Sequence, residues 1–257
     1  MLDAERQETP LGVPPEIGSW KRRLTLALGR ATRHGISGTI ARYSAVGDPP
    51  IFANAQFAWV KTLEDNWRVI RADADAILRR KDTVPSLVEI SPDHKGISDG
   101  KWKSFFLWGY GFRIAENCER CPQTAALLDN IPGLQSAFFS IMDPGAHLIP
   151  HRGVTKAIFT THLALRVPRA AERCWMTVDG QKVIWREGEA LLFDDTYEHE
   201  VRNETPEDRV ILLLHVKRPV RFAGSLLADF FLWCVRSSPF IQDALKNLEA
   251  WNSGQKP

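Results

Sequence analysis

Between positions 102 and 216 the sequence divides into short runs that have the composition and the alternation of β-strands. AspGly at 179–180 separates two of these runs, and this dipeptide is a strong signal for a β-hairpin. Many short strands at regular spacing indicate a jelly-roll barrel. The expected strands cover residues 159–167, 174–178, 182–185, 190–193, 199–203 and 209–216.

Helical segments are expected before this β region. Residues 16–34 have apolar positions at helical spacing and no acidic residue between positions 21 and 33, so we expect a basic amphipathic helix. Such a helix either lies on an anionic membrane surface or packs on the core with its charged face in solvent. A second helix is expected over 59–80. Its apolar stripe consists of Trp59, Leu63, Trp67 and Ile70.

The sequence after the β region predicts a strongly apolar helix. Leu226, Leu227, Phe230, Phe231 and Cys234 recur at helical spacing, and the residues between positions 231 and 236 are apolar all round. Such a stretch must be buried in protein or lipid, and this one is too short to span a bilayer. Two interpretations are open. The helix packs against the barrel, or it is partly embedded at a membrane surface. Basic residues bracket it: Lys217, Arg218, Arg221 and Arg236.

We therefore expect a mainly β fold with flanking helices and a double-stranded β-helix (jelly-roll) core. The expected organisation is an N-terminal helical lead and extension over 1–101, a jelly-roll core over 102–219 and a C-terminal helical appendage over 220–257. The 257 residues are 44% hydrophobic, which is enough for a core without disulfides. A net charge of +2 does not indicate a nucleic-acid partner. The oligomeric state is not indicated.

Cellular location and cysteine chemistry follow from simple features. The chain begins without signal-peptide features and has no run of ~20 apolar residues. The expected location is cytoplasmic, with peripheral attachment to the inner face of the membrane as the alternative that the terminal helices leave open. Cys118 and Cys121 form a C-x-x-C without a second pair. They are either a disulfide or redox pair, or two reduced thiols.

Two histidines carry the strongest chemical signal in the chain. His151 lies in ProHisArgGly, His199 lies in PheAspAspThrTyrGluHisGluVal, and Arg209 follows ten residues later. Imidazole suits Fe(II) and leaves positions open for oxygen and a cosubstrate. Arginine binds a carboxylate through a two-pronged fork. The pattern predicts an iron site that uses a 2-oxo acid. The histidines expected to be packed or at the surface are His34, His94, His147 and His215.

These strings resemble the aspartyl/asparaginyl β-hydroxylase family of Fe(II)/2-oxoglutarate oxygenases, including its bacterial lipid-hydroxylase branch. PheSerIleMetAspProGlyAlaHis at 139–147 and HisLeuAlaLeu at 162–165 are also similar. The resemblance implies that His151 and His199 bind iron. It implies that Arg209 and Ser140 hold the distal carboxylate of 2-oxoglutarate and that His162 assists there. With O2, this chemistry yields succinate, carbon dioxide and a hydroxylated product.

One ligand that most such oxygenases have is absent. Their iron site combines two histidines with a carboxylate, which usually stands two residues after the first histidine. That position is Gly153 here. The resembled family shows the same absence, so we expect water to fill the place. Asp194 and Asp195 are rival ligands, and we expect them to support the end of the barrel instead.

A second difference from the resembled family bears on the substrate. Relatives that act on peptide aspartate carry arginines just before the position of His162, but residues 157–161 read AlaIlePheThrThr. Lys156 offers partial compensation. The leading substrate is therefore a membrane-lipid acyl chain, and the alternative is an aspartyl or asparaginyl residue or a free amino acid. Two non-enzymatic interpretations remain, a cupin-like metal-binding protein and a membrane-surface adaptor with a vestigial barrel.

Overall fold

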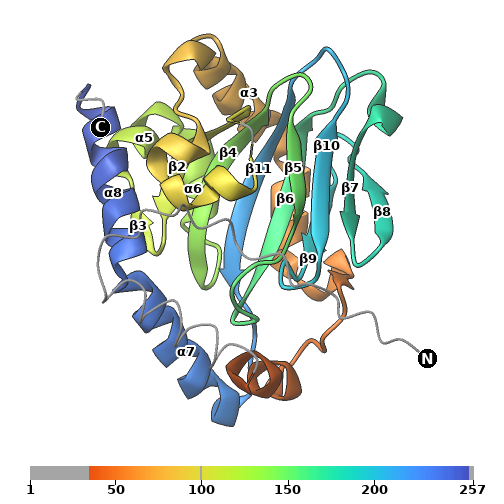
Figure 1. The fold of residues 1–257 in the computed structure, drawn as a ribbon, viewed down its shortest axis with the longest axis vertical. Helices are drawn as coiled ribbons and strands as arrows, with labels where there is room; N and C mark the ends of the chain where they lie inside the picture. The colour runs from red at the N-terminus through yellow and green to blue at the C-terminus, as the bar shows by residue number, and fades with distance from the viewer. Residues whose placement is uncertain (1–34, 99, 255–257) are drawn as a thin grey trace.

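The computed structural model describes residues 35–98 and 100–254, and two antiparallel sheets form its centre (Figure 1). The larger sheet has the order β1-β9-β6-β11-β4-β2-β3, and the smaller sheet has the order β5-β10-β7-β8. The strands are β1 (Ile51–Phe52), β2 (Trp102–Gly109), β3 (Phe112–Arg113), β4 (Leu134–Met142), β5 (His147–His151), β6 (Ile158–Arg166), β7 (Cys174–Val178), β8 (Gln181–Ile184), β9 (Ala190–Phe193), β10 (His199–Asn203) and β11 (Arg209–Lys217).

The path of the chain through the two sheets is that of a jelly roll. From β4 to β11 the chain repeatedly crosses between them, so that β4, β6, β9 and β11 lie in the larger sheet and β5, β7, β8 and β10 in the smaller one. The expectation of a mainly β protein with flanking helices and a jelly-roll core is therefore confirmed. Strands over 190–193 and 199–203 lie where the sequence predicts them. The hairpin turn is also present, with positive φ at Asp179 and Gly180, as a type I′ turn requires.

The larger sheet is buried on both faces because apolar residues occupy both sets of alternating positions. Leu212 and Leu214 belong to the core cluster on its outer face, whereas Ile211 and Leu213 belong to the cluster between the two sheets. Helices from both halves of the chain surround the sheets (Figure 1). They are α2 (Ala58–Asp65), α3 (Trp67–Leu78), α4 (Leu87–Ile90), α5 (Ala115–Arg120), α6 (Pro122–Leu128), α7 (Phe222–Arg236), α8 (Pro239–Asn252) and a helix over 35–43. Short 3-10 turns cover Asn54–Gln56, Lys81–Thr83, Pro92–Gly96 and Ala171–Arg173.

The prediction of one helix over 59–80 is wrong, because the segment forms two helices that meet at Asn66. The backbone of Asn66 has φ −106° and ψ 11°, and its side-chain amide donates to the carbonyl of Thr62. Asparagine competes for backbone hydrogen bonds in this way and favours helix ends. The predicted stripe is divided between the two helices, but Leu63 and Ile70 are both buried in the outer cluster.

The C-terminal helices differ in how they pack. The side-chain amide of Asn247 on α8 donates to the carbonyl of Ile90, which ties α8 to α4. α7 buries Ala228 but leaves Phe222, Leu226, Phe230 and Trp233 exposed. Packing against the protein, the first of the two interpretations, therefore holds for one side of this helix, and its other side is exposed. Among the described residues, none of the helices has both the length and the apolarity needed to cross a membrane.

Some expectations concern residues or properties on which the structure does not bear. The basic helix over 16–34 and His34 lie outside the described residues. The domain boundaries after 101 and 219 stay a prediction, although β1 from the N-terminal extension pairs with β9. Cys118 and Cys121 are buried free thiols in the structure, and burial raises the pKa of Cys121 to about 12.

Candidate metal and oxo-acid site

His151 and His199 lie side by side at one end of the smaller sheet. They are directly paired across β5 and β10, and their ring centroids are 4.1 Å apart. The register of β5 shifts between this pair and the next, in which Leu148 faces Val201. Such a bulge re-aims a side chain, and Pro150 within it needs no ladder partner for an N–H. The bulge brings His151 to the face that His199 shares with the buried Val201.

The hydrogen bonds of the two rings leave the same nitrogen available on each. His151 Nδ1 lies 2.7 Å from the carbonyl oxygen of Ile149, and His199 Nδ1 lies 3.0 Å from that of Tyr197. Because a carbonyl only accepts, each Nδ1 carries a proton and each Nε2 carries a lone pair. Burial lowers the pKa of both rings, and burial together with neighbouring His151 lowers the pKa of His199 to about 3. Both rings are therefore neutral and oriented, as metal ligands must be.

A second group of buried side chains lies beyond Phe193. The Phe193 ring is 5.0 Å from the His162 ring and 5.7 Å from the His199 ring, measured between centroids. His162 in turn stacks on Trp185 at 6.1 Å. The guanidinium of Arg209 lies 4.7 Å from the centre of a Trp185 ring. The histidine pair and this group are thus neighbouring parts of one site between the sheets.

The second group is rich in hydrogen-bond donors that have no acceptor. Within the part of the chain that the structure describes, Nε and Nη1 of Arg209 and Nε1 of Trp185 are buried N–H groups without a partner, and Nδ1 of His162 is a further buried nitrogen without one. Burial lowers the pKa of Arg209 to about 10, so the guanidinium keeps its charge at neutral pH. A buried cation without a counterion is costly. The arrangement therefore suits an anion with several acceptor oxygens, such as a carboxylate.

Ser140 approaches the same interior from β4. Its buried hydroxyl oxygen accepts a hydrogen bond of 2.9 Å from the indole of Trp102. The hydroxyl keeps its own proton for a further acceptor. The predicted residues Ser140, His162 and Arg209 all lie buried in neighbouring strands of the larger sheet. Their roles stay a prediction. Trp102 and Trp185 were missed, because sequence alternation marks a buried indole without showing what it faces.

A carboxylate lies beside the position where the usual third ligand is absent. A Cβ atom added to Gly153 would overlap the carboxylate of Asp195. The backbone N–H of Gly153 also donates to the carbonyl of Asp195 at 2.6 Å, and the Asp195 carboxylate accepts from Thr160 at 3.2 Å. Only glycine permits so close an approach. Among the described residues, no three histidines, cysteines or acidic residues gather tightly enough to form a metal site, so two histidines are the ligands to test.

Asp194 has a different role from its neighbour. Its fully buried carboxylate pairs with Arg218, which is also fully buried, and with Lys156. Burial alone would raise the pKa of Asp194, but the attraction of Arg218 and hydrogen bonds from Lys156 and Thr196 outweigh it and lower the pKa. Lys156 also pairs with Asp48 at 2.8 Å. Asp194 therefore links β9 to the segment before β6 and the segment after β11 at this end of the barrel. Lys156, which was expected to compensate for the absent arginines, is engaged by Asp194 and Asp48.

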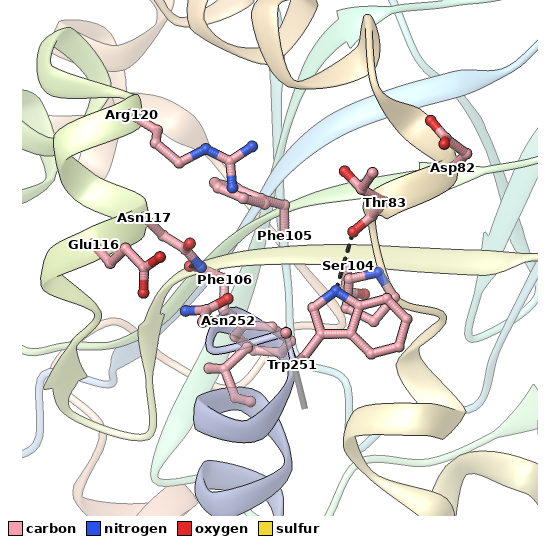
Figure 2. A pocket seen from close by; sticks show the side chains of 13 residues that line it. Asp82, Thr83, Ser104, Phe105, Phe106, Glu116, Asn117, Arg120, Trp251 and Asn252 are labelled. Atoms are coloured by element: carbon pink, nitrogen blue, oxygen red, sulfur yellow. Dashed lines mark hydrogen bonds between the residues drawn. The ribbon is translucent and has the colours of Figure 1, made fainter. Parts of the chain in front are cut away.

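A separate cavity of about 400 Å³ lies between β2 and the C-terminal end of α8 (Figure 2). Phe105 and the indole of Trp251 form part of its lining, and Trp251 donates to the carbonyl of Thr83 at 3.0 Å. The lining of this cavity includes neither His151, His199 nor Arg209. Chemistry that depends on those residues cannot take place there. The candidate site is instead the interior between the two sheets.

A family model and the sequences of characterised relatives indicate one family. The model of the aspartyl/asparaginyl beta-hydroxylase family matches residues 64–219. The ornithine lipid ester-linked acyl 2-hydroxylase of Rhizobium tropici is 39% identical over 215 residues, which cover 82% of this chain and 75% of that protein. The aspartyl/asparaginyl beta-hydroxylase of Homo sapiens is 34% identical over 166 residues, which cover 62% of this chain and 21% of that protein. The chain thus spans most of the bacterial relative but about a fifth of the human one.

Proposed function

Because the chain belongs to the aspartyl/asparaginyl beta-hydroxylase family, we propose that it is an Fe(II)- and 2-oxoglutarate-dependent dioxygenase. The proposed reaction hydroxylates an unactivated C–H bond in a membrane-lipid acyl chain. One observation carries this proposal. A neutral histidine pair, with Nδ1 of each ring hydrogen-bonded to a backbone carbonyl, lies in the same interior as a buried guanidinium whose Nε and Nη1 have no partner among the described residues. A protein that only bound a metal would not need the second feature.

The residues present fit both the metal and the cosubstrate. His151 and His199 would hold Fe(II) through Nε2, and the carbonyls of Ile149 and Tyr197 keep the rings in the required tautomer. When bound, Fe(II) and 2-oxoglutarate supply, with O2, an oxidative decarboxylation that yields succinate and drives hydroxylation. Asp195 offers an acceptor beside Gly153 for the water expected in place of the third ligand.

The donors between the sheets would orient the cosubstrate. Arg209 would pair with its distal carboxylate through Nε and Nη1, which are the guanidinium atoms without a partner. Ser140 would donate its hydroxyl proton to the same carboxylate, while Trp102 holds its oxygen. His162 is neutral because burial, followed by the charge of Arg209, lowers its pKa. A neutral ring in this place can share a hydrogen bond without adding a second cation.

The surroundings of the site support a substrate without negative charge. Thr160 stands two residues before His162 and donates to Asp195. Lys156 is held by Asp48 and Asp194. An acidic side chain entering here would meet neither an arginine at 157–161 nor an uncommitted Lys156. The similarity to a bacterial lipid acyl hydroxylase over 82% of this chain supports the same choice.

The proposal is tested by substrate-dependent succinate formation. The purified protein, loaded with Fe(II) under anaerobic conditions, is given 2-oxoglutarate and air. Parallel samples contain vesicles of a bacterial lipid extract, an aspartate-containing peptide or free amino acids. We expect the vesicles to stimulate succinate formation and the hydroxyl group to appear on an acyl chain. Stimulation by peptide or amino acid alone would contradict the lipid substrate but leave the assignment as a dioxygenase in place. Absence of 2-oxoglutarate turnover with all three would contradict the class.

A further inference from the structure

One face of α7 exposes a continuous row of large apolar side chains. Phe222, Leu226, Phe230 and Trp233 are 83%, 64%, 59% and 62% exposed, which are the largest values for big apolar residues in the described chain. Their spacing of four, four and three places them on one side of the helix. The rings of Phe230 and Trp233 stack on each other at 6.0 Å. We call these four residues the α7 row.

The opposite side of α7 is fixed to the protein. Ala228 is fully buried in a small cluster with Ile40 and Ala157, and the partly buried Leu232 packs against the same cluster. A side chain at Gly224 would overlap Tyr43. The helix over 35–43 and α7 therefore pack on each other at one end of the molecule (Figure 1). The orientation of the row towards solvent is determined by this packing.

The α7 row begins at the same end of the barrel as the histidine pair. Lys217, the last residue of β11, pairs with Ile158, the first residue of β6. The segment that leads into α7 and the loop that follows His151 therefore leave the barrel from one end. That loop carries Val154, which is 43% exposed, and Ile149 before it is 37% exposed. Exposed apolar residues thus occur both on α7 and on either side of His151.

Positive charge accompanies this face. Arg221 is exposed where α7 begins, and Asp229, the acidic residue of this helix, is paired with Lys217. The helix over 35–43, which packs on α7, begins at the first described residue, Gly35. The preceding sequence carries Lys21, Arg22, Arg23, Arg30 and Arg33, with no acidic residue from 21 to 33. A partner for this face must therefore tolerate apolar side chains and attract cations.

We propose that the α7 row docks on the surface of an anionic phospholipid bilayer. Trp and Phe are favoured at the membrane interface, and anionic lipids attract adjacent Lys and Arg. A second copy of the chain would bring two faces of the same positive sign together, which disfavours it. The inference deepens the proposed function and rests on it for its purpose, because docking would bring the end of the barrel that carries the histidine pair to a layer of acyl chains.

Vesicle binding tests the docking proposal and requires no iron, 2-oxoglutarate or turnover. Failure of the docking proposal can therefore be distinguished from failure of the proposed activity. The full chain is co-sedimented with vesicles of phosphatidylglycerol and phosphatidylcholine, and with vesicles of phosphatidylcholine alone. We expect stronger binding to the anionic vesicles. At about 0.15 M salt, where the screening length is ~8 Å, binding should weaken. Lack of binding to anionic vesicles at low salt would overturn the proposal.

Variants locate the docking face. Phe230→Ser with Trp233→Ser should weaken binding roughly tenfold or more, because two exposed rings lose apolar contact with lipid. Arg221→Gln should weaken it roughly fivefold. Ile184→Ser is the matched control, since Ile184 is 41% exposed on β8 in the smaller sheet. Circular dichroism checks the fold of each variant. Equal binding by the double variant and the wild type would overturn the assignment of the face.

Cys234 provides a measurement that needs no substitution. It is an exposed thiol on α7, while Cys118, Cys121 and Cys174 are buried. We expect rapid maleimide labelling of Cys234 in solution and slower labelling with anionic vesicles. Slow labelling without vesicles that speeds up on dilution would show that a second copy covers the row. Slow labelling independent of protein concentration would show that residues 1–34 cover it. Either result would overturn the proposal.

Discussion

The carboxylate of Asp195 occupies the space that a side chain at position 153 would need. Position 153 lies two residues after His151, where most iron oxygenases of this class place their carboxylate ligand. The glycine and the aspartate are thus complementary features of one site. Because Gly153 has no side chain, the loop after β5 leaves room for the carboxylate of Asp195 from the loop before β10. A hydrogen bond of 2.6 Å from the Gly153 N–H to the Asp195 carbonyl joins the two loops.

This relationship makes a counterintuitive prediction for Gly153→Asp. Adding a carboxylate to the usual ligand position should weaken Fe(II) binding, because the new side chain overlaps Asp195 and displaces the loop of His151. Gly153→Ala should show the same steric effect and lower the free energy of unfolding by ~1–3 kcal/mol, as overpacking usually does. Iron titration and urea unfolding measure the two effects. Gly38→Ala is the control, since no atom lies within 4 Å of its added Cβ. Tighter iron binding by Gly153→Asp would refute this account.

Loss of either paired histidine should nearly abolish iron binding and turnover. The reason is that His151 and His199 are the two proposed ligands and lie side by side, so each substitution to alanine leaves one. Anaerobic titration with Fe(II) measures the effect. His147→Ala should bind iron normally, because its ring pairs with Glu200 outside the site. Full iron affinity in the double variant His151→Ala and His199→Ala would show that the metal binds elsewhere.

Arg209→Ala should impair the use of 2-oxoglutarate much more than the binding of iron. Truncating one partner of a buried charge pair costs ~2–5 kcal/mol, which corresponds to a KM roughly 30-fold to several-thousand-fold higher. Arg209→Lys should rescue poorly because an ammonium group lacks the planar fork. The thermal shift caused by 2-oxoglutarate should disappear in both variants. Arg202→Ala, on a side chain that is 39% exposed, is the control. An unchanged KM in Arg209→Ala would argue against the carboxylate pocket.

Much of the barrel could be predicted from the sequence because period-two alternation is a local property. The strands β7, β9 and β10 have the expected bounds. The break at Asn66 was missed because an apolar stripe continues across it at helical spacing. The bulge at Pro150 was missed because it depends on pairing with β10. Local pattern shows which residues are buried, but not which distant strand they meet.

The site was predictable in its residue types and less so in its contacts. The histidines and Arg209 occur in recognisable strings. Trp185 follows β8 and was expected only as the end of a strand, although its indole contacts both Arg209 and His162. The partner of Asp194 was also unpredicted, because Arg218 lies beyond β11 and reaches it only in the folded barrel. No sequence spacing encodes these tertiary pairs.

The pair of Asp194 and Arg218 should dominate the acid sensitivity of this end of the barrel. Asp194→Asn should lower the free energy of unfolding by ~3–5 kcal/mol at neutral pH, since it removes the fully buried partner of Arg218 and leaves the guanidinium with the partly exposed Asp48. The pKa of Asp194 is lower in the folded chain than in the unfolded chain. Its ionised form therefore stabilises the fold above about pH 4, and this contribution is lost as the pH falls through the lowered value.

Urea unfolding between neutral and acidic pH measures this effect. The difference between wild type and Asp194→Asn should shrink as the pH falls. Asp65→Asn is the control, because Asp65 is 57% exposed in its pair with Lys61 and such surface pairs contribute little. A difference that stays constant with pH would mean that ionisation of Asp194 does not stabilise the fold.

The central claim is oxygenation of a lipid acyl chain at the histidine pair, and mass spectrometry of whole cells tests it most directly. Lipid and peptide extracts are compared from cells that lack this protein and carry either the wild type or His199→Ala. The account predicts lipids heavier by one oxygen atom, located on an acyl chain by fragmentation, in the wild-type cells alone. The same mass increase on peptides or amino acids, with unchanged lipids, would contradict the lipid assignment. Identical lipid and peptide extracts from the two strains would contradict the claim that this site oxygenates either class.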